Sequence, residues 1–375
     1  MPSILPNNLE DHWSAVVRTL CEVGAPSGHE DRLVQIIYEH LVDRGMTPVV
    51  DRLGQVSMSF GAAEAETGNS ILVTAHLDQL GLVVSSIQPD GYIKFERLGG
   101  VPERVLPGTR IRIHAQGHEV PSVVGLKSHH LTPPDEKYRA FPAASLYLDA
   151  GASNAADVER LGVRIGDPCT YEFGWSELQD GRVSTTSLDD RLGVAALLVL
   201  IDRLIVQRPA GIVHFAFTTQ EEFHVRGTLA LVERYKPDIV VNVDISPATD
   251  TPDLNGQSGV HLGGGPVISR LSFHGRGTLG GLIPHPGLLA AAVASAEAAC
   301  PNYQFEAIVG LITDAAFVPM ATADGIATIG ISIPVRYTHS PIETGQLSDL
   351  KHTVDLLHDL VVRARDIDLS RFTAV

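Results

Sequence analysis

The chain has 375 residues, of which 44% are hydrophobic and 19% charged, so it can bury a large core in one or two domains and is not expected to be disordered. Its formal net charge of −16 repels phosphate backbones and argues against nucleic acid as a partner. The three cysteines form no Cys-x-x-Cys pair, and charges interrupt the apolar stretches before they reach membrane-spanning length. The first dozen residues contain no apolar signal core, so we expect a cytoplasmic protein without membrane contact.

The first 80 residues predict two helices followed by three strands. Apolar residues at helical spacing indicate a first helix over 11–24. The second begins at Ser27, where Glu30 three positions later completes the pattern of a capping box, and it ends at Gly45. The strands are expected at 47–51, 55–60 and 71–77.

From Gly81 to about Val183 the sequence changes to short β-rich runs separated by turn residues. Two of these runs, 83–88 and 92–98, flank Pro-Asp-Gly and form a predicted hairpin. Helical spacing is almost absent, so we predict a compact all-β module. Its further strands are expected at 110–115, 122–125, 146–148 and 169–173.

From residue 185 onward, strands and helices alternate. The expected strands are 212–219, 239–245, 267–273, 303–308 and 328–334. The expected helices are 190–206, 226–235, 286–299, 314–322 and 346–366. We predict an α/β class with a doubly wound, mixed sheet in a domain formed by residues 1–80 and 184–375. The all-β module of residues 81–183 is inserted into that domain.

Potential metal ligands follow the apolar runs that we predict as buried strands. These residues are His76, Asp78, Glu221, Glu222, Asp244 and His339, while Asp189 opens a predicted helix. Ligands of open α/β sheets bind beyond the carboxyl ends of the strands, where these side chains would meet. Asp78 could accept a hydrogen bond from His76 or orient a catalytic base. Two histidines, several carboxylates and a spare glutamate predict a two-metal hydrolase site.

Each of these residues also has a structural interpretation. Asp189 and Asp190 suit the first turn of a helix, whose dipole favours acids, and His339 could belong to a turn. Glu221 and Glu222 are harder to explain in this way, because adjacent side chains on a strand diverge and suit two roles, one ligand and one base. One shared site explains the whole set better than a separate structural reason for each member.

Several short motifs recur in one order along the chain. They are Pro-Ser-Gly-His-Glu at 26–30, Ala-His-Leu-Asp at 75–78, Leu-Asp-Asp-Arg at 188–191, Gln-Glu-Glu at 220–222, Val-Asp at 243–244, Thr-Asp-Ala at 313–315 and Pro-Val-Arg-Tyr-Thr-His-Ser-Pro at 334–341. In these motifs the chain resembles the tetrahedral aminopeptidases, a family of deblocking, glutamyl and leucyl aminopeptidases with relatives labelled endoglucanases. The resemblance covers residues 26–343, almost the whole chain.

The resemblance implies two divalent metal ions per subunit and no other cofactor. Zinc, cobalt and manganese all suit mixed nitrogen and oxygen ligands. The implied ligands are Asp189 for both ions, His76 and Asp244 for one, and Glu222 and His339 for the other. Glu221 would be the general base and Asp78 the partner of His76, and the peptide bond between Asp189 and Asp190 would be cis.

Two segments depart from the family pattern. His224 stands where a glycine is usual, and Leu311-Ile312 precede Thr313 where two glycines are usual. Both segments are expected near the substrate pocket, so the sequence does not predict which side chain the enzyme prefers.

We expect a metal-dependent aminopeptidase that hydrolyses N-terminal residues from peptides, with Glu221 as the general base of a metal-activated water. One alternative is an amidohydrolase or deacylase of the same fold. Another is a catalytically silent assembly stabilised by metal, although such a site has no use for Glu221. The resemblance also implies that the β module is a dimerisation domain and that dimers build a homo-oligomeric dodecamer.

Overall fold

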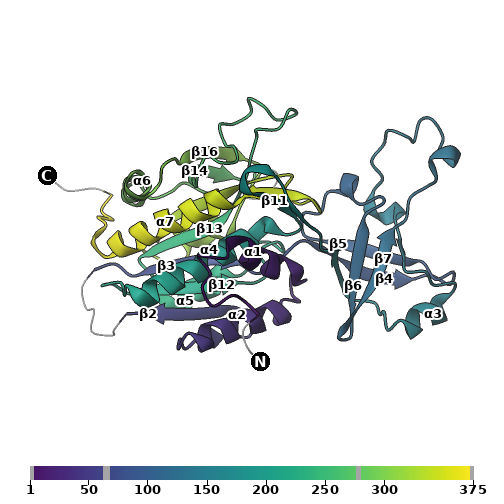
Figure 1. Cartoon of the computed structure of the whole chain (residues 1–375), viewed down its shortest axis with the longest axis horizontal. Coiled ribbons are helices and arrows are strands. Elements are labelled where there is room, and N and C mark those ends of the chain that lie inside the picture. The colour runs from purple at the N-terminus through teal and green to yellow at the C-terminus, as the bar shows by residue number, and fades with distance from the viewer. Residues whose placement is uncertain (1–3, 62–67, 276–279, 372–375) are drawn as a thin grey trace.

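The computed structural model describes residues 4–61, 68–275 and 280–371, and it consists of a mixed sheet between helices with a barrel at one side (Figure 1). The sheet contains 12 strands of the described chain, with the main order β1-β2-β12-β3-β13-β17-β18-β11-β10. Strands β12, β3, β13 and β17 run parallel, and antiparallel strands extend the sheet on both sides. The predicted mixed α/β sheet is therefore confirmed.

The strands of this sheet have the following bounds: β1 Val49–Val50, β2 Val56–Phe60, β3 Ile71–His76, β10 Trp175–Glu177, β11 Arg182–Thr185, β12 Val213–Thr218, β13 Ile239–Pro247, β14 Val267–Phe273, β15 Gly281–Leu282, β16 Gln304–Val309, β17 Ala327–Arg336 and β18 Glu343–Gln346. Strand β14 pairs with β15, β16 and β17 and so forms a branch of the sheet. The parallel strands are buried in almost every position because helices cover both of their faces.

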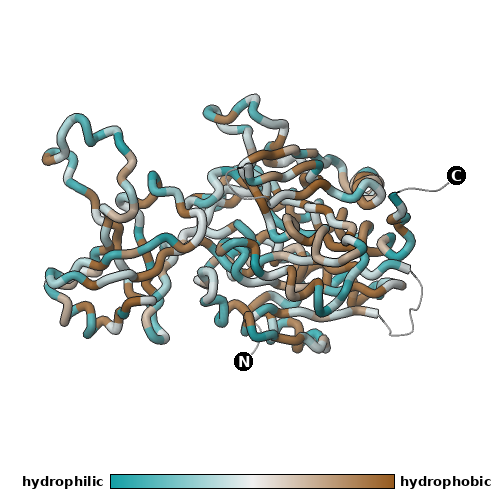
Figure 2. The backbone as a smooth tube through the Cα atoms, turned by 180° about the vertical axis from the view of Figure 1, so that it is seen from behind, coloured by the Kyte–Doolittle hydropathy of each residue, from teal (hydrophilic) through white to brown (hydrophobic). Residues whose placement is uncertain are grey.

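The helices divide between two hydrophobic cores. The larger core includes α1 (Trp13–Glu22), α2 (Asp31–Asp43), α4 (Leu188–Val206), α6 (Pro286–Ala299) and α7 (Leu347–Arg363). The smaller core includes α5 (Thr228–Tyr235) and the 3-10 helix η5 (Asp314–Met320). On β3, Ile71 and Val73 belong to the larger core and Leu72 to the smaller one, which is the alternation expected of a strand. The apolar backbone segments accordingly gather inside the body (Figure 2).

The barrel is formed by residues between 81 and 171 and lies beside the body (Figure 1). Its strands are β4 Gly81–Ile87, β5 Ile93–Leu98, β6 Arg110–Ala115, β7 His118–Val124, β8 Leu148–Asp149 and β9 Pro168–Tyr171, which close in the order β4-β5-β8-β7-β6-β9. Inward side chains such as Leu82, Phe95 and Ile113 form a core of their own. One short helix, α3 (Ala155–Arg160), lies between β8 and β9.

Several local predictions were wrong. Helix α2 begins at Asp31, with Glu30 at the N-cap position and no side-chain cap, so Ser27 lies before the cap, and its hydroxyl donates to Asp78. The helix expected at 314–322 is the 3-10 helix η5, which contains Pro319. Strands β10, β11, β15 and β18 were not predicted. Among the described residues, no helix is both long and apolar enough to span a membrane.

Candidate active site

Six of the seven predicted site residues lie at or just beyond the carboxyl ends of the parallel strands, and the seventh, Asp189, lies at the start of a helix. His76 ends β3, and its neighbour in the sheet register is Thr218, the last residue of β12, so the loop after β12 brings Glu221 and Glu222 beside it. Asp244 lies near the end of β13. His339 follows β17 in a turn, and Asp189 stands at the start of α4. Asp78 lies two residues beyond β3 and is fully buried.

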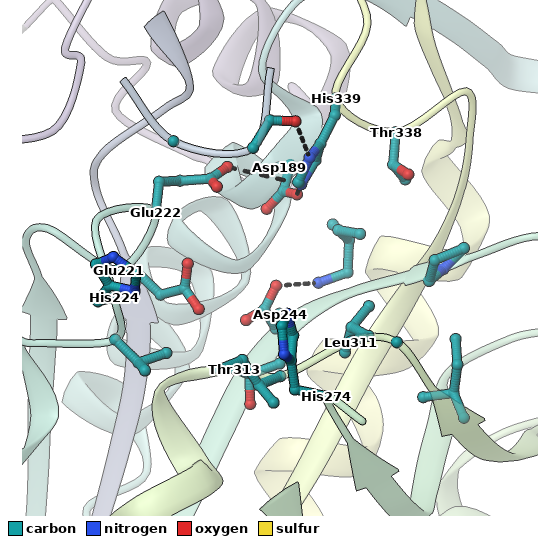
Figure 3. Close-up of a pocket in the computed structure, with 18 of the residues that line it drawn as sticks. Asp189, Glu221, Glu222, His224, Asp244, His274, Leu311, Thr313, Thr338 and His339 are labelled. Atoms are coloured by element: carbon teal, nitrogen blue, oxygen red, sulfur yellow. Dashed lines mark hydrogen bonds and ion pairs between the residues drawn. The ribbon is translucent and has the colours of Figure 1, made fainter. Parts of the chain in front are cut away.

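Asp189 lies between the two histidines. Its Oδ1 atom is 3.1 Å from Nε2 of His76, and its Oδ2 atom is 3.5 Å from Nε2 of His339. Nε2 of His76 is also 3.9 Å from Oδ1 of Asp244, and Nε2 of His339 is 3.9 Å from Oε1 of Glu222. The donor atoms therefore form two groups of three that share Asp189, and within each group all atoms lie within 4.8 Å of one another. Figure 3 shows the group of Asp189, Glu222 and His339, with Asp244 of the other group nearby.

The donor groups fit divalent metal ions. Each group combines one imidazole nitrogen with two carboxylates, a ligand set typical of zinc, cobalt or manganese. The Oε1 atom of Glu222 is buried and has no hydrogen-bond partner among the described residues. Such an atom requires an explanation, because buried carboxylate oxygens are normally paired. A cation between Glu222 and His339 would provide it.

The electrostatics of the site reflect its crowding with buried charges. Burial raises the pKa of Glu222 to about 8 and the pKa of Asp244 to about 7. Burial also opposes ionisation of Asp189, but hydrogen bonds to His339 and His76 hold its pKa well below the usual range. Several carboxylates that resist ionisation beside one another are stabilised when a divalent cation binds between them.

Asp78 supports the site through its backbone and its side chain. Nδ1 of His76 lies 3.0 Å from the main-chain oxygen of Asp78 and 3.5 Å from its Oδ1 atom. The carboxylate accepts hydrogen bonds from the main-chain N–H groups of Glu221 at 2.9 Å and Glu222 at 3.0 Å. It also accepts one from the Ser27 hydroxyl at 2.6 Å. Asp78 thus contacts both His76 and the loop that carries the two glutamates.

Glu343 was not predicted from the sequence. It holds the backbone of His339 and Asp189 as Asp78 holds the backbone of the two glutamates. Its carboxylate accepts hydrogen bonds from the N–H of His339 at 2.7 Å and from the N–H of Asp189 at 3.1 Å. It is 2% exposed and lies at the start of β18. The only signal for Glu343 in the sequence is an acidic residue four positions after His339, because β18 has no apolar run.

The two residues after Asp189 have structural roles. The peptide bond between Asp189 and Asp190 is cis, as the resemblance implied. Asp190 accepts hydrogen bonds from the N–H groups of Gly193 at 2.9 Å and His76 at 3.2 Å and belongs to neither donor group. Arg191 is fully buried and donates to the carbonyl oxygens of Leu20, Val23 and Leu77 and to Oε1 of Gln79.

The donor groups open into a cavity of about 690 Å³. Apolar side chains from the end of β16 and from the segment after it form part of its wall, namely Ile308, Val309, Leu311 and Ile312. His224 and His274 also line it, and His224 adopts a left-handed backbone with φ of 72°. Both segments that depart from the family pattern therefore line the cavity (Figure 3).

The barrel contributes to this cavity as well. Gly99 and Gly100, which follow β5, line it together with Arg97. The carbonyl oxygen of Gly100 lies 3.1 Å from Nδ1 of His339. A side chain at Gly100 would place its first carbon 3.0 Å from that nitrogen and would crowd the His339 ring.

Comparison with known proteins agrees with this geometry. The family of M42 glutamyl aminopeptidases matches residues 57–356. The chain is 34% identical over 339 residues to the putative aminopeptidase SgcX of Escherichia coli K12, a match that covers 90% of each chain. The chain belongs to the M42 peptidase family. It is therefore a hydrolase that acts on peptides, its relatives are aminopeptidases, and peptidases of this family depend on divalent metal ions.

Solved structures of M42-like aminopeptidases have the same fold. The aminopeptidase APDkam598 of the archaeon Desulfurococcus kamchatkensis is 30% identical, with a TM-score of 0.86 over 93% of this chain and 94% of that one. The TET1 peptidase of Pyrococcus horikoshii is 29% identical, with a TM-score of 0.80 over 92% of this chain and 98% of that one. That peptidase can assemble into a tetrahedron or a large octahedral shell. The resemblance to tetrahedral aminopeptidases is thus confirmed.

Proposed function

We propose that this M42 peptidase is a two-metal aminopeptidase that removes N-terminal residues from peptides. The main support is Asp189, whose two carboxylate oxygens face two different histidines. His76 and Asp244 would hold one ion, Glu222 and His339 would hold the other, and Asp189 would be shared. When bound, two such ions lower the pKa of water and polarise the scissile carbonyl group.

Glu221 would be the general base. Its side chain lines the cavity next to the donor groups but belongs to neither, so its carboxylate remains available. It would accept a proton from the attacking water and donate it to the leaving amine. The two hydrogen bonds that Asp78 accepts from the backbone of Glu221 and Glu222 would hold this loop in place.

The preferred substrate would carry an apolar N-terminal side chain. The cavity wall formed by Ile308, Val309, Leu311 and Ile312 has no charge to pair with a lysine or glutamate side chain. Outside the proposed metal centre, Arg97 is the one permanently charged residue among the described residues that line the cavity, and it lies on the barrel side. Burying a charged side chain without a partner costs more than burying leucine gains.

We further propose that residues 81–183 form a dimerisation domain inserted into a catalytic domain of residues 1–80 and 184–375. The barrel has its own hydrophobic core, as an independent domain requires. Its segment between β7 and β8 exposes Leu126, Leu131 and Tyr138 by 61%, 79% and 93%. Large apolar side chains that gather on an exposed segment are typical of an interface. By analogy with the TET1 peptidase, the assembly would be a large homo-oligomer, with a dodecamer as the expected form.

A panel of aminoacyl anilides tests this function. Enzyme loaded separately with zinc, cobalt or manganese is given leucyl, glutamyl and lysyl anilides, together with the N-acetylated form of each. We expect release of aniline from the leucyl substrate in preference to the other two, and none from the acetylated forms. Turnover restricted to acetylated substrates would identify a deacylase, and no turnover with any metal would favour a catalytically silent assembly.

A further inference from the structure

The loop that carries the proposed base has an irregular backbone. After β12 ends at Thr218, Gln220 adopts φ of 60°, and His224 and Val225 adopt φ of 72° and 47°. None of these residues is glycine, so each occupies a left-handed conformation that its side chain disfavours. A backbone of this kind persists only where surrounding groups hold it.

Glu30 is one of the groups that hold this loop, although it is 190 positions away in the sequence. Its Oε1 atom accepts hydrogen bonds from the N–H of Gln220 at 3.1 Å and from the N–H of Gly28 at 2.8 Å. Glu30 is 4% exposed, and its side chain makes no capping hydrogen bond to helix α2. A buried carboxylate with no role in its own helix is expected to serve a neighbouring segment.

The turn at residues 27–30 also supports the loop indirectly, through Ser27 and Asp78. Ser27 donates its hydroxyl hydrogen to Asp78, whose carboxylate accepts the N–H groups of Glu221 and Glu222. The turn at residues 27–30 therefore supports three successive N–H groups of the loop: Glu30 directly accepts the first, and Ser27 orients the acceptor of the other two. Hydrogen bonds to carboxylates are about twice as strong as those between neutral groups.

We propose that Glu30 is a positioning residue for peptide hydrolysis. By accepting the N–H of Gln220, it fixes the left-handed backbone at that residue and so directs the side chain of Glu221 into the cavity. The inference rests on the proposed role of Glu221 as general base. It assigns to Glu30 an effect on the rate of the chemical step and none on the binding of substrate, because Glu30 does not line the cavity.

A double-mutant cycle tests this role. The variants are Glu30→Ala, Glu221→Gln and the double variant, with Asp31→Ala as the control because Asp31 is an exposed acid at the adjacent position. We expect Glu30→Ala to lower kcat by roughly 10- to 100-fold, as misplacement of a reacting group does, with KM nearly unchanged. In the Glu221→Gln background the same substitution should have little further effect, since the group that it positions is already disabled. Asp31→Ala should retain wild-type kcat.

A conservative variant separates positioning from general stability. The amide oxygen of Glu30→Gln can accept the same two N–H groups, so this variant should recover most of the activity that Glu30→Ala loses. Equal losses of kcat from Glu30→Ala in both backgrounds, or no rescue by Glu30→Gln at unchanged metal content, would overturn the inference. Full activity of Glu221→Gln would instead overturn the proposed base, and inactive wild-type enzyme would overturn the proposed function; in either case the role of Glu30 falls with it.

Discussion

Two buried carboxylates outside the donor groups hold the backbone of the proposed catalytic residues. Asp78 accepts the N–H groups of Glu221 and Glu222, and Glu343 accepts those of Asp189 and His339. Metal ligands and catalytic groups are effective when a surrounding layer of hydrogen bonds fixes their orientation. The arrangement therefore aims the two glutamates and the shared aspartate before substrate binds.

Adjacent glutamates with different proposed roles should respond differently to the same substitution. Glu221→Gln keeps the size of the side chain but cannot accept a proton, so kcat should fall by roughly 10²–10⁴-fold while metal content is unchanged. Glu222→Gln should lose metal, since a neutral amide is a poor replacement for a carboxylate ligand. Elemental analysis and anilide turnover measure both effects. Metal loss in Glu221→Gln alone would mean that the two roles are reversed.

The shared position of Asp189 makes a prediction about stoichiometry. Asp189→Asn should weaken the binding of both ions, because both donor groups include this carboxylate and its two oxygens face different histidines. His339→Ala should weaken chiefly one ion, because its ring belongs to one group. Titration with metal, followed by elemental analysis of each variant, checks this difference. Two tightly bound ions in Asp189→Asn would contradict a bridging role.

At the scale of elements, the sequence was most informative where a local pattern determines the structure. The buried strands β3, β12, β13 and β17 are largely apolar and have polar residues at or near their carboxyl ends, and both features are visible in the sequence. Strand β18 could not be predicted, because its Glu-Thr-Gly-Gln sequence forms a strand only by pairing with β11 and β17. The same limit applies to Glu343 and to the turn at residues 27–30, whose partners are distant in sequence.

Helix α4 is tied to its neighbours through Arg191. The guanidinium group donates to the carbonyl oxygens of Leu20 and Val23 at the end of α1 and of Leu77 after β3. Arg191→Met should lower the free energy of unfolding by about 3–5 kcal/mol, because these buried acceptors lose their donor. The control is Arg203→Met on the same helix, whose partly exposed ion pairs should contribute about 1 kcal/mol. Denaturant unfolding of both variants at one protein concentration measures the difference, and equal effects would contradict it.

At the scale of the whole molecule, the exposed apolar segment of the barrel predicts self-association. Light scattering of the wild-type protein should give a mass well above the 40.2 kDa of one chain. Tyr138→Asp should shift the mass toward smaller species, because a charge buried in an interface is costly. Val206→Asp is the matched control, since Val206 is 89% exposed on the body and Tyr138 is 93% exposed on the barrel. A wild-type protein that is monomeric at micromolar concentration would refute the proposed assembly.

The contact between Gly100 and His339 limits how far this enzyme can be reduced in size. A truncated chain in which a short linker replaces the barrel residues 81–171 would keep the sheet and its helices, but its His339 ring would lose the carbonyl oxygen beside Nδ1. The smallest autonomous peptidase must therefore retain the segment after β5. A barrel grafted from a relative should also keep glycine at positions 99 and 100, because a side chain at the first would crowd Leu80 and one at the second would crowd the His339 ring.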